Sequence, residues 1–195
     1  FDFGETNMNN FDRRKFLKML GAAAAVSTLS KGINAATTAP RVVVVGGGFG
    51  GATVAKYLRM WGGNVEVTLV EPNQSHYSCI LSNLVVTGAL AMSSINLNYN
   101  TLRNVYGVTL LAGKAIAIDG PGNKLTVRTS TGKIVLPYDH LVLSPGIDFV
   151  PPAAGQWDVK LTPHAWQAGN QTTLLKNQLA AMRNYDQFVM TVPKS

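Results

Sequence analysis

The stretch Arg41–Ala52, with the sequence Arg-Val-Val-Val-Val-Gly-Gly-Gly-Phe-Gly-Gly-Ala, decides the fold of this chain. Its four consecutive valines are typical of a strand that is buried on both faces of a parallel sheet. Gly46, Gly48 and Gly51 follow at the spacing of a dinucleotide-binding turn. The first glycine permits a sharp turn, the second lets a pyrophosphate approach the backbone, and the third lets the next helix pack closely. The stretch therefore predicts a strand, a tight turn and a helix whose free N–H groups face an anion.

The helix and the strand expected after the glycine turn complete a βαβ unit. We expect a helix over 49–60 and a second strand over 65–70. That strand ends at Glu71, about 20–25 residues beyond the glycines, where an acidic side chain suits a ribose hydroxyl. Because these parts occur in this order, the sequence predicts a dinucleotide site rather than an ordinary glycine-rich turn. The candidate binding residues here are Gly46, Gly48, Phe49, Gly50, Gly51, Glu71 and Pro72.

Composition and charge restrict the classes of protein to consider. The chain has 195 residues, room for one domain and part of another, and a net charge of +7. Its charges are scattered rather than gathered in a basic stripe, so nucleic-acid binding is not expected. Cys79 is the only cysteine, so an internal disulfide and a Cys-x-x-Cys-His haem motif are excluded. Since His76, His140 and His164 are spread along the chain, no metal site is expected.

Residues 1–39 resemble an export signal. Arg13 and Arg14 precede an alanine-rich apolar run over 19–29, which is too short to span a bilayer as a stable helix. Small residues at 35–36 would allow cleavage. The arrangement is similar to a twin-arginine signal, which predicts passage through the Tat translocase into the periplasm without stable membrane insertion. The alternative is an amphipathic helix that stays attached.

The later part of the chain predicts a β-meander and then one more buried strand. We expect a short helix over 98–104, followed by strands over 108–118, 124–129 and 133–136 with turns between them. The final strand ends in Ser144-Pro145-Gly146, which resembles the Ala-Thr-Gly segment of flavoproteins of the glutathione-reductase type. Together with the meander, this segment favours FAD over NAD as the dinucleotide.

These patterns predict an α/β architecture. Residues 40–155 are expected to form a Rossmann-like FAD-binding domain with a parallel sheet and a β-meander. Residues 156–195 are expected to hold a linker, a helix over 171–182, and a strand from Phe188 that starts a second dinucleotide-type domain. We interpret the chain as the amino-terminal part of a longer protein.

Cys79 follows a polar loop at the carboxyl end of the second strand, the edge where ligands bind in open α/β sheets. A lone cysteine is more often a small core residue than a reactive group. A helix amino end at this position would instead favour its thiolate.

Several segments together resemble the flavin subunits of flavocytochrome c sulfide dehydrogenases. They are residues 42–52, 67–73, 77–83, 144–149 and 163–169, of which 77–83 and 163–169 are the more specific. The resemblance implies that the sulfur of Cys79 is bound covalently to the 8α-methyl group of FAD. It also implies FAD contacts from the glycines and Glu71, from the backbone of Ala115 near the adenine, and from Ser144, Pro145 and Gly146 on the flavin side.

The resemblance further implies a function for the full protein. Sulfide would be oxidised at a redox-active disulfide beside the flavin, and a separate c-type cytochrome subunit would accept the electrons. The cysteines of that disulfide are expected beyond Ser195, so no catalytic residue is expected in this chain and the isolated fragment is expected to be inactive. Two alternatives stay open: a sulfide:quinone or NADH:quinone reductase with FAD, and a truncated flavin-binding fragment without catalysis.

Overall fold

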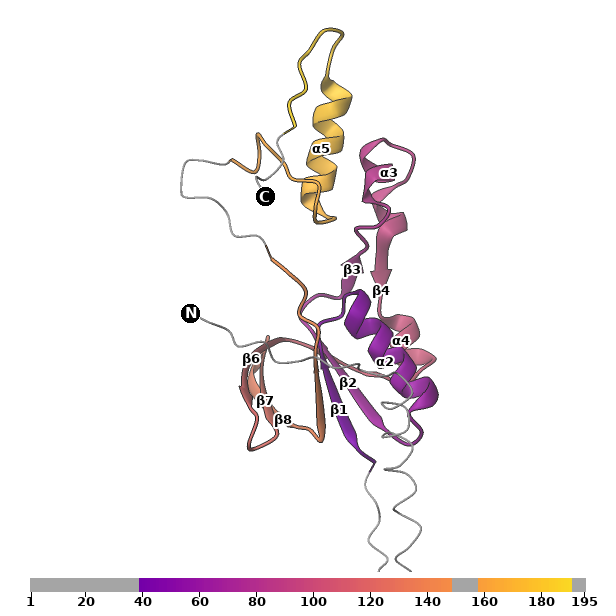
Figure 1. The fold of residues 1–195 in the computed structure, drawn as a ribbon, viewed down its shortest axis with the longest axis vertical. Helices are drawn as coiled ribbons and strands as arrows, with labels where there is room; N and C mark the ends of the chain where they lie inside the picture. The colour runs from indigo at the N-terminus through magenta and orange to yellow at the C-terminus, as the bar shows by residue number, and fades with distance from the viewer. Residues whose placement is uncertain (1–38, 149–157, 191–195) are drawn as a thin grey trace, which may run out of the picture.

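A four-stranded parallel sheet forms the centre of the computed structural model, which describes residues 39–148 and 158–190. Its strand order is β5-β2-β1-β9, as Figure 1 shows in part. The strands are β1 (Arg41–Val45), β2 (Glu66–Glu71), β5 (Thr109–Ala112) and β9 (His140–Leu143). This arrangement confirms the predicted α/β, Rossmann-like class. Arg13 and Arg14 of the expected export signal lie outside the described residues.

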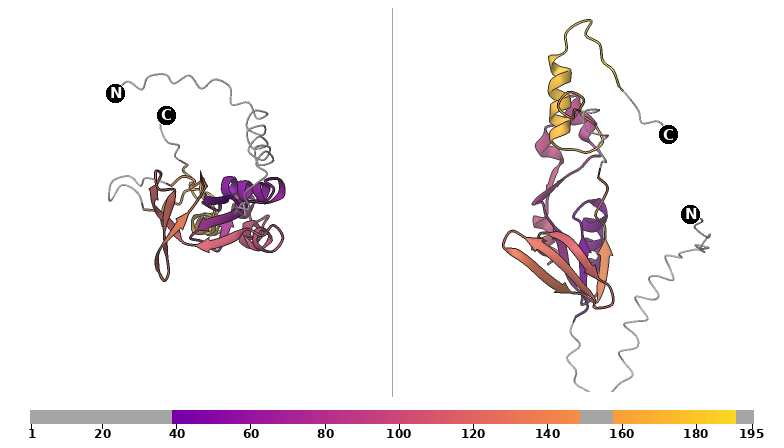
Figure 2. Two further views of the ribbon diagram at one scale, coloured as in Figure 1. Left: turned by 90° about the horizontal axis from the view of Figure 1, so that it is seen from below. Right: turned by 90° about the vertical axis from the view of Figure 1, so that its left-hand side faces the viewer.

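The valines of β1 divide between two hydrophobic cores, one on each face of the sheet. Val42 and Val44 pack with residues of α2 (Phe49–Trp61) and α4 (Asn100–Asn104). Val43, on the opposite face, packs with buried residues of the β-meander. Figure 2 shows the meander and α2 on opposite sides of the sheet. Burial on both faces explains why this strand is a continuous apolar run.

The meander is an antiparallel sheet of β6 (Lys114–Asp119), β7 (Lys124–Thr129) and β8 (Gly132–Pro137). The prediction of one strand over 108–118 is wrong, because that segment contributes β5 to the parallel sheet and β6 to the meander. The chain passes between the two sheets at Gly113. A Cβ on this glycine would lie 2.6 Å from Cγ1 of Val127, so the crossing has no room for a side chain.

A second part of the molecule extends from the carboxyl edge of the parallel sheet (Figure 1). It contains a ribbon of two antiparallel strands, β3 (Ser75–Tyr77) and β4 (Asn96–Asn98), with α3 (Ser82–Val86) and the 3₁₀ helix η2 (Met92–Ile95) between them. The helix α5 (Asn170–Ala181) packs beside α3 and agrees with the helix expected over 171–182.

The strand expected from Phe188 is not present in the described residues. Residues 182–190 form neither helix nor strand. A strand is stabilised by hydrogen bonds to a neighbouring strand, so an apolar stretch such as the one from Phe188 does not form a strand without a neighbour. None of the described helices is both long and apolar enough to cross a membrane.

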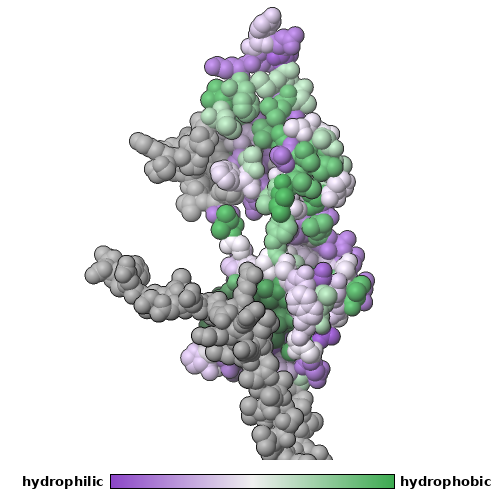
Figure 3. All heavy atoms as spheres, turned by 45° about the vertical axis from the view of Figure 1, so that its right-hand side comes forward, coloured by the Kyte–Doolittle hydropathy of each residue, from purple (hydrophilic) through white to green (hydrophobic). Residues whose placement is uncertain are grey.

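Hydrophobic side chains cover part of the surface in the upper part of the molecule, which contains α3 and α5 (Figure 1 and Figure 3). Ile80 and Leu81 beside α3 are exposed, and so are Leu161 and Trp166 ahead of α5. Packing between the two helices thus leaves apolar side chains on the outside of this part of the molecule.

An ion pair joins the beginnings of β1 and β9. Nη2 of Arg41 lies 3.0 Å from Oδ1 of Asp139, and the backbone N–H of Arg41 donates to Oδ2 at 2.7 Å. These hydrogen bonds lower the pKa of the Asp139 carboxyl to about 2. The stabilisation is present above the unfolded-state pKa of about 3.9 and is lost as the pH falls through the folded-state value. Since both side chains are exposed to solvent, at 45% and 43%, the contribution of the ion pair to stability is modest.

Candidate functional site

The glycine loop between β1 and α2 is packed so closely that backbone atoms exclude a side chain at Gly46 and Gly51. Gly46 has a φ of +96°, and a Cβ there would overlap the backbone oxygen of Ser144. A Cβ on Gly51 would overlap the backbone oxygen of Gly46. The loop therefore turns sharply off β1, and α2 begins directly against the strand.

The amino end of α2 has N–H groups that no side chain caps. Gly48 is the N-cap residue, it makes no side-chain cap hydrogen bond, and the first turn contains no acidic residue. A Cβ on Gly48 would meet only Cε1 of His76, at 3.8 Å. Since this 13-residue helix directs its first N–H groups and its positive dipole end outward, the position can hold an anion.

Glu71 connects the end of β2 to the glycine loop. Its Oε2 accepts a hydrogen bond from the backbone N–H of Gly47 at 2.7 Å. Its Oε1 accepts from the backbone N–H and the Nδ2 of Asn73 at 2.9 and 2.8 Å. A carboxylate offers roughly four lone-pair positions, so Glu71 can also accept a bond from a ribose hydroxyl.

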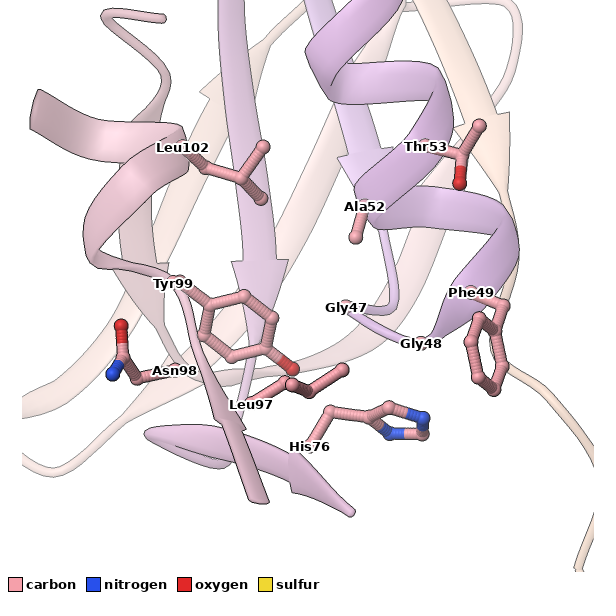
Figure 4. Close-up of a pocket in the computed structure, with 10 residues that line it drawn as sticks. All are labelled: Gly47, Gly48, Phe49, Ala52, Thr53, His76, Leu97, Asn98, Tyr99 and Leu102. Atoms are coloured by element: carbon pink, nitrogen blue, oxygen red, sulfur yellow. The ribbon is translucent and has the colours of Figure 1, made fainter. Parts of the chain in front are cut away.

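A cavity of about 290 Å³ opens beside this loop, between α2, α4 and the β3–β4 ribbon. Figure 4 shows the residues that line it: Gly47, Gly48, Phe49, Ala52, Thr53, His76, Leu97, Asn98, Tyr99 and Leu102. Its size is at the lower end of small-molecule pockets, and its lining is mostly apolar with a few polar groups, as is usual for such sites.

Tyr99 closes the cavity from the side of α4, and its hydroxyl points toward Gly47 (Figure 4). A Cβ on Gly47 would lie 2.5 Å from the Tyr99 oxygen, so the ring fits only against a glycine. Burial, and then the nearby Glu71 carboxylate, raise the pKa of Tyr99 to about 12. The hydroxyl therefore stays protonated at physiological pH and can donate a hydrogen bond.

The residues predicted from the sequence fall into two groups. Gly48 and Phe49 line the cavity. The Ser144-Pro145-Gly146 segment lies against the glycine loop: a Cβ on Gly50 would be 2.6 Å from Oγ of Ser144. Ser144 is tied there by a hydrogen bond from its N–H to the Val45 oxygen at 2.8 Å. The structure thus brings the two predicted cofactor segments together.

Other predicted residues lie apart from the cavity. Ala115 packs against the core on the meander face of the sheet. Pro72 is exposed just beyond β2. Cys79 is exposed in the turn before α3, where its carbonyl oxygen accepts a hydrogen bond from Oγ of Ser82 at 2.8 Å. The alternative that Cys79 is a small core residue is therefore wrong, because the residue is exposed.

Several lining residues were not identified from the sequence, Tyr99 foremost. The spacing of Tyr99 and Leu102 marks the buried side of the expected helix, but the contact with Gly47 depends on how the ribbon crosses the sheet edge. In the part of the chain that the structure describes, no cluster of His, Cys, Asp or Glu could hold a metal ion.

Comparison with known proteins shows the family to which the chain belongs. Residues 40–187 match the family model described as pyridine nucleotide-disulphide oxidoreductase. The chain is 60% identical over 45 residues to the sulfide dehydrogenase [flavocytochrome c] flavoprotein chain of Chlorobaculum thiosulfatiphilum, covering 23% of this chain and 94% of the relative. It is 34% identical over 107 residues to the type II NADH:quinone oxidoreductase NdhA of Mycobacterium tuberculosis, covering 54% of this chain and 22% of that one.

A solved structure shares the fold. The sulfide:quinone oxidoreductase from Aquifex aeolicus superposes with a TM-score of 0.61 and 24% identity, over 73% of this chain and 32% of that chain. The chain therefore spans between a fifth and a third of the length of these last two proteins.

Proposed function

Since the chain belongs to the pyridine nucleotide-disulphide oxidoreductase family, we propose that it is the FAD-binding part of a sulfide dehydrogenase whose electrons pass to a c-type cytochrome. Members of this family are flavoprotein oxidoreductases, so the chain is part of such an enzyme and is expected to bind FAD. The proposal of sulfide as substrate and a cytochrome as acceptor is supported by one observation. The chain is 60% identical to a sulfide dehydrogenase flavoprotein chain over 45 residues, which cover 94% of that relative.

The described residues fit FAD. The uncapped amino end of α2, with the bare backbone of Gly48, would hold the pyrophosphate, and Glu71 has acceptor capacity left for the ribose. The backbone of Ala115 would meet the adenine. Ser144, Pro145 and Gly146 would lie on the flavin side. Bound FAD supplies two-electron oxidation together with one-electron delivery to an acceptor. The chain's own residues bind and orient it.

We also propose that the sulfur of Cys79 forms a covalent bond to the 8α-methyl group of the flavin. Support comes from the exposure of this thiol at the turn before α3 and from its being the sequence's only cysteine. No residue of this chain is assigned to the sulfur chemistry itself.

A spectroscopic experiment on the intact protein tests the sulfide assignment. With FAD bound, anaerobic addition of sulfide is expected to bleach the flavin absorbance, and oxidised cytochrome c added afterwards is expected to restore it. NADH is expected to leave the absorbance unchanged. The matched control repeats the titration on free FAD.

The same experiment separates the alternatives. Bleaching by NADH and reoxidation by a soluble quinone would favour the NADH:quinone reductase, the candidate supported by 34% identity over 107 residues. Bleaching by sulfide with reoxidation by quinone alone would favour a sulfide:quinone reductase. Bound flavin that responds to neither donor would favour a non-catalytic flavin-binding fragment.

The twin arginines Arg13 and Arg14 support a proposed periplasmic location reached through the Tat translocase. The double substitution Arg13→Lys with Arg14→Lys keeps the charge but removes the arginine pair. We expect it to retain the protein in the cytoplasm, as measured by cell fractionation. Lys18→Arg is the matched control and should not change export. Continued export of the double variant would contradict the Tat proposal.

A further inference from the structure

The imidazole of His76 lies directly beside the glycine loop. His76 is the middle residue of β3, and its ring meets the Phe49 ring edge to face, with centroids 5.4 Å apart and an interplanar angle of 84°. Figure 4 shows the ring extending below Gly48 toward Phe49. The β3–β4 ribbon thus carries a side chain to the amino end of α2 from outside the parallel sheet.

One nitrogen of this ring is buried without a partner. Nε2 of His76 has no hydrogen bond among the described residues. Buried polar atoms in native proteins are nearly always paired with protein, water or ligand, because an unpaired one loses its hydration without compensation. The position therefore calls for a hydrogen-bonding partner that enters the cavity.

The chemistry of the cavity wall indicates an anionic acceptor. His76 is the only basic side chain among the described residues that line the cavity; its other polar side chains are those of Thr53, Asn98 and Tyr99. Beside the ring of His76 lie the uncapped N–H groups at the start of α2, since a Cβ on Gly48 would be 3.8 Å from Cε1 of His76. All of these groups can donate hydrogen bonds, and a phosphate oxygen accepts them.

We propose that Nε2 of His76 donates a hydrogen bond to the pyrophosphate of the bound dinucleotide, making His76 a positioning residue of the FAD site. The proposal rests on FAD binding as proposed above. The bond needs a proton on Nε2, which one neutral tautomer and the imidazolium both supply. The phosphates are then held from two sides, by the backbone of α2 and by the ribbon.

Binding of ADP and adenosine tests this role, because the two probes differ in the pyrophosphate. The measurement uses the intact protein carrying Cys79→Ser, after removal of any flavin, so that the probes can enter the site. In this background His76→Phe keeps an aromatic ring against Phe49 but removes the donor. We expect its ADP binding in calorimetry to be about 10- to 100-fold weaker, as for the loss of a hydrogen bond to a charged group, with adenosine binding unchanged.

Two further variants complete the design. His76→Gln retains an N–H donor and is expected to recover part of the ADP affinity. His140→Phe makes the same chemical change on the exposed histidine of β9, outside the cavity, and is expected to bind both probes normally.

The outcomes separate this inference from the proposed function. Unchanged ADP binding by His76→Phe would overturn the role of His76 and leave the FAD site standing. Equal weakening of ADP and adenosine would also overturn it, since the ring would then only shape the cavity. If the protein with His76 intact binds neither ADP nor FAD, the proposed function fails and this inference fails with it.

Discussion

Replacing Gly51 with alanine is expected to destabilise the fold by about 3 kcal/mol or more and to abolish FAD binding. Helix propensity alone favours the opposite sign, since alanine in a helix is better than glycine by about 0.5–1 kcal/mol. Packing decides the result. The new Cβ would overlap the backbone oxygen of Gly46 and lie 3.3 Å from Cγ1 of Val44. Neither neighbour can retreat unless α2 separates from β1.

Urea unfolding and FAD titration of the intact protein measure this effect. Gly120→Ala is the matched control, because Gly120 lies in an exposed turn and a Cβ there would meet no atom within 4 Å. That change is expected to alter the free energy of unfolding by no more than about 0.5 kcal/mol. A Gly51→Ala protein as stable as the parent would show that the contact between loop and helix is looser than described.

Substitution of Cys79 by serine is expected to convert the flavin from acid-stable to fully releasable. A thioether to the flavin survives acid precipitation, whereas a flavin held by hydrogen bonds and packing leaves when the fold is lost. The intact parent protein should therefore give a yellow pellet, and Cys79→Ser should give a colourless pellet and a yellow supernatant. Absorbance of both fractions and the mass of the peptide that contains Cys79 provide the measurement.

Thr87→Ser is a suitable control for the flavin experiment. It is a conservative change at the end of α3, close in sequence to Cys79, and leaves the thiol in place. Its pellet should remain yellow. Free flavin in the supernatant of the parent protein would exclude covalent attachment, although the FAD site at the glycine loop would be unaffected by that result.

Local sequence patterns were sufficient to predict the parallel sheet and the glycine loop of the candidate site. Four valines specify a strand buried on both faces, and the glycine spacing specifies the turn, because both depend on neighbours within a few residues. The helices α2 and α5 agree with their expected ranges for the same reason.

Features that depend on distant partners could not be predicted this way. Apolar residues occur on both sides of Gly113, and the chain leaves the parallel sheet for the meander at this glycine, which divides β5 from β6. Tyr99 and His76 come to the glycine loop because the β3–β4 ribbon crosses the sheet edge, which no pattern in either segment indicates. The expected strand at Phe188 has no partner strand and does not form in the described residues.

The hydrogen bond from Gly47 to Glu71 has a consequence for the energetics of binding. Because both partners of this bond belong to the chain itself, the bond fixes the backbone of the loop independently of the nucleotide. Ordering flexible segments is a large part of the entropic cost of association. The loop is therefore preorganised, and more of the interaction energy with the phosphates is available as affinity.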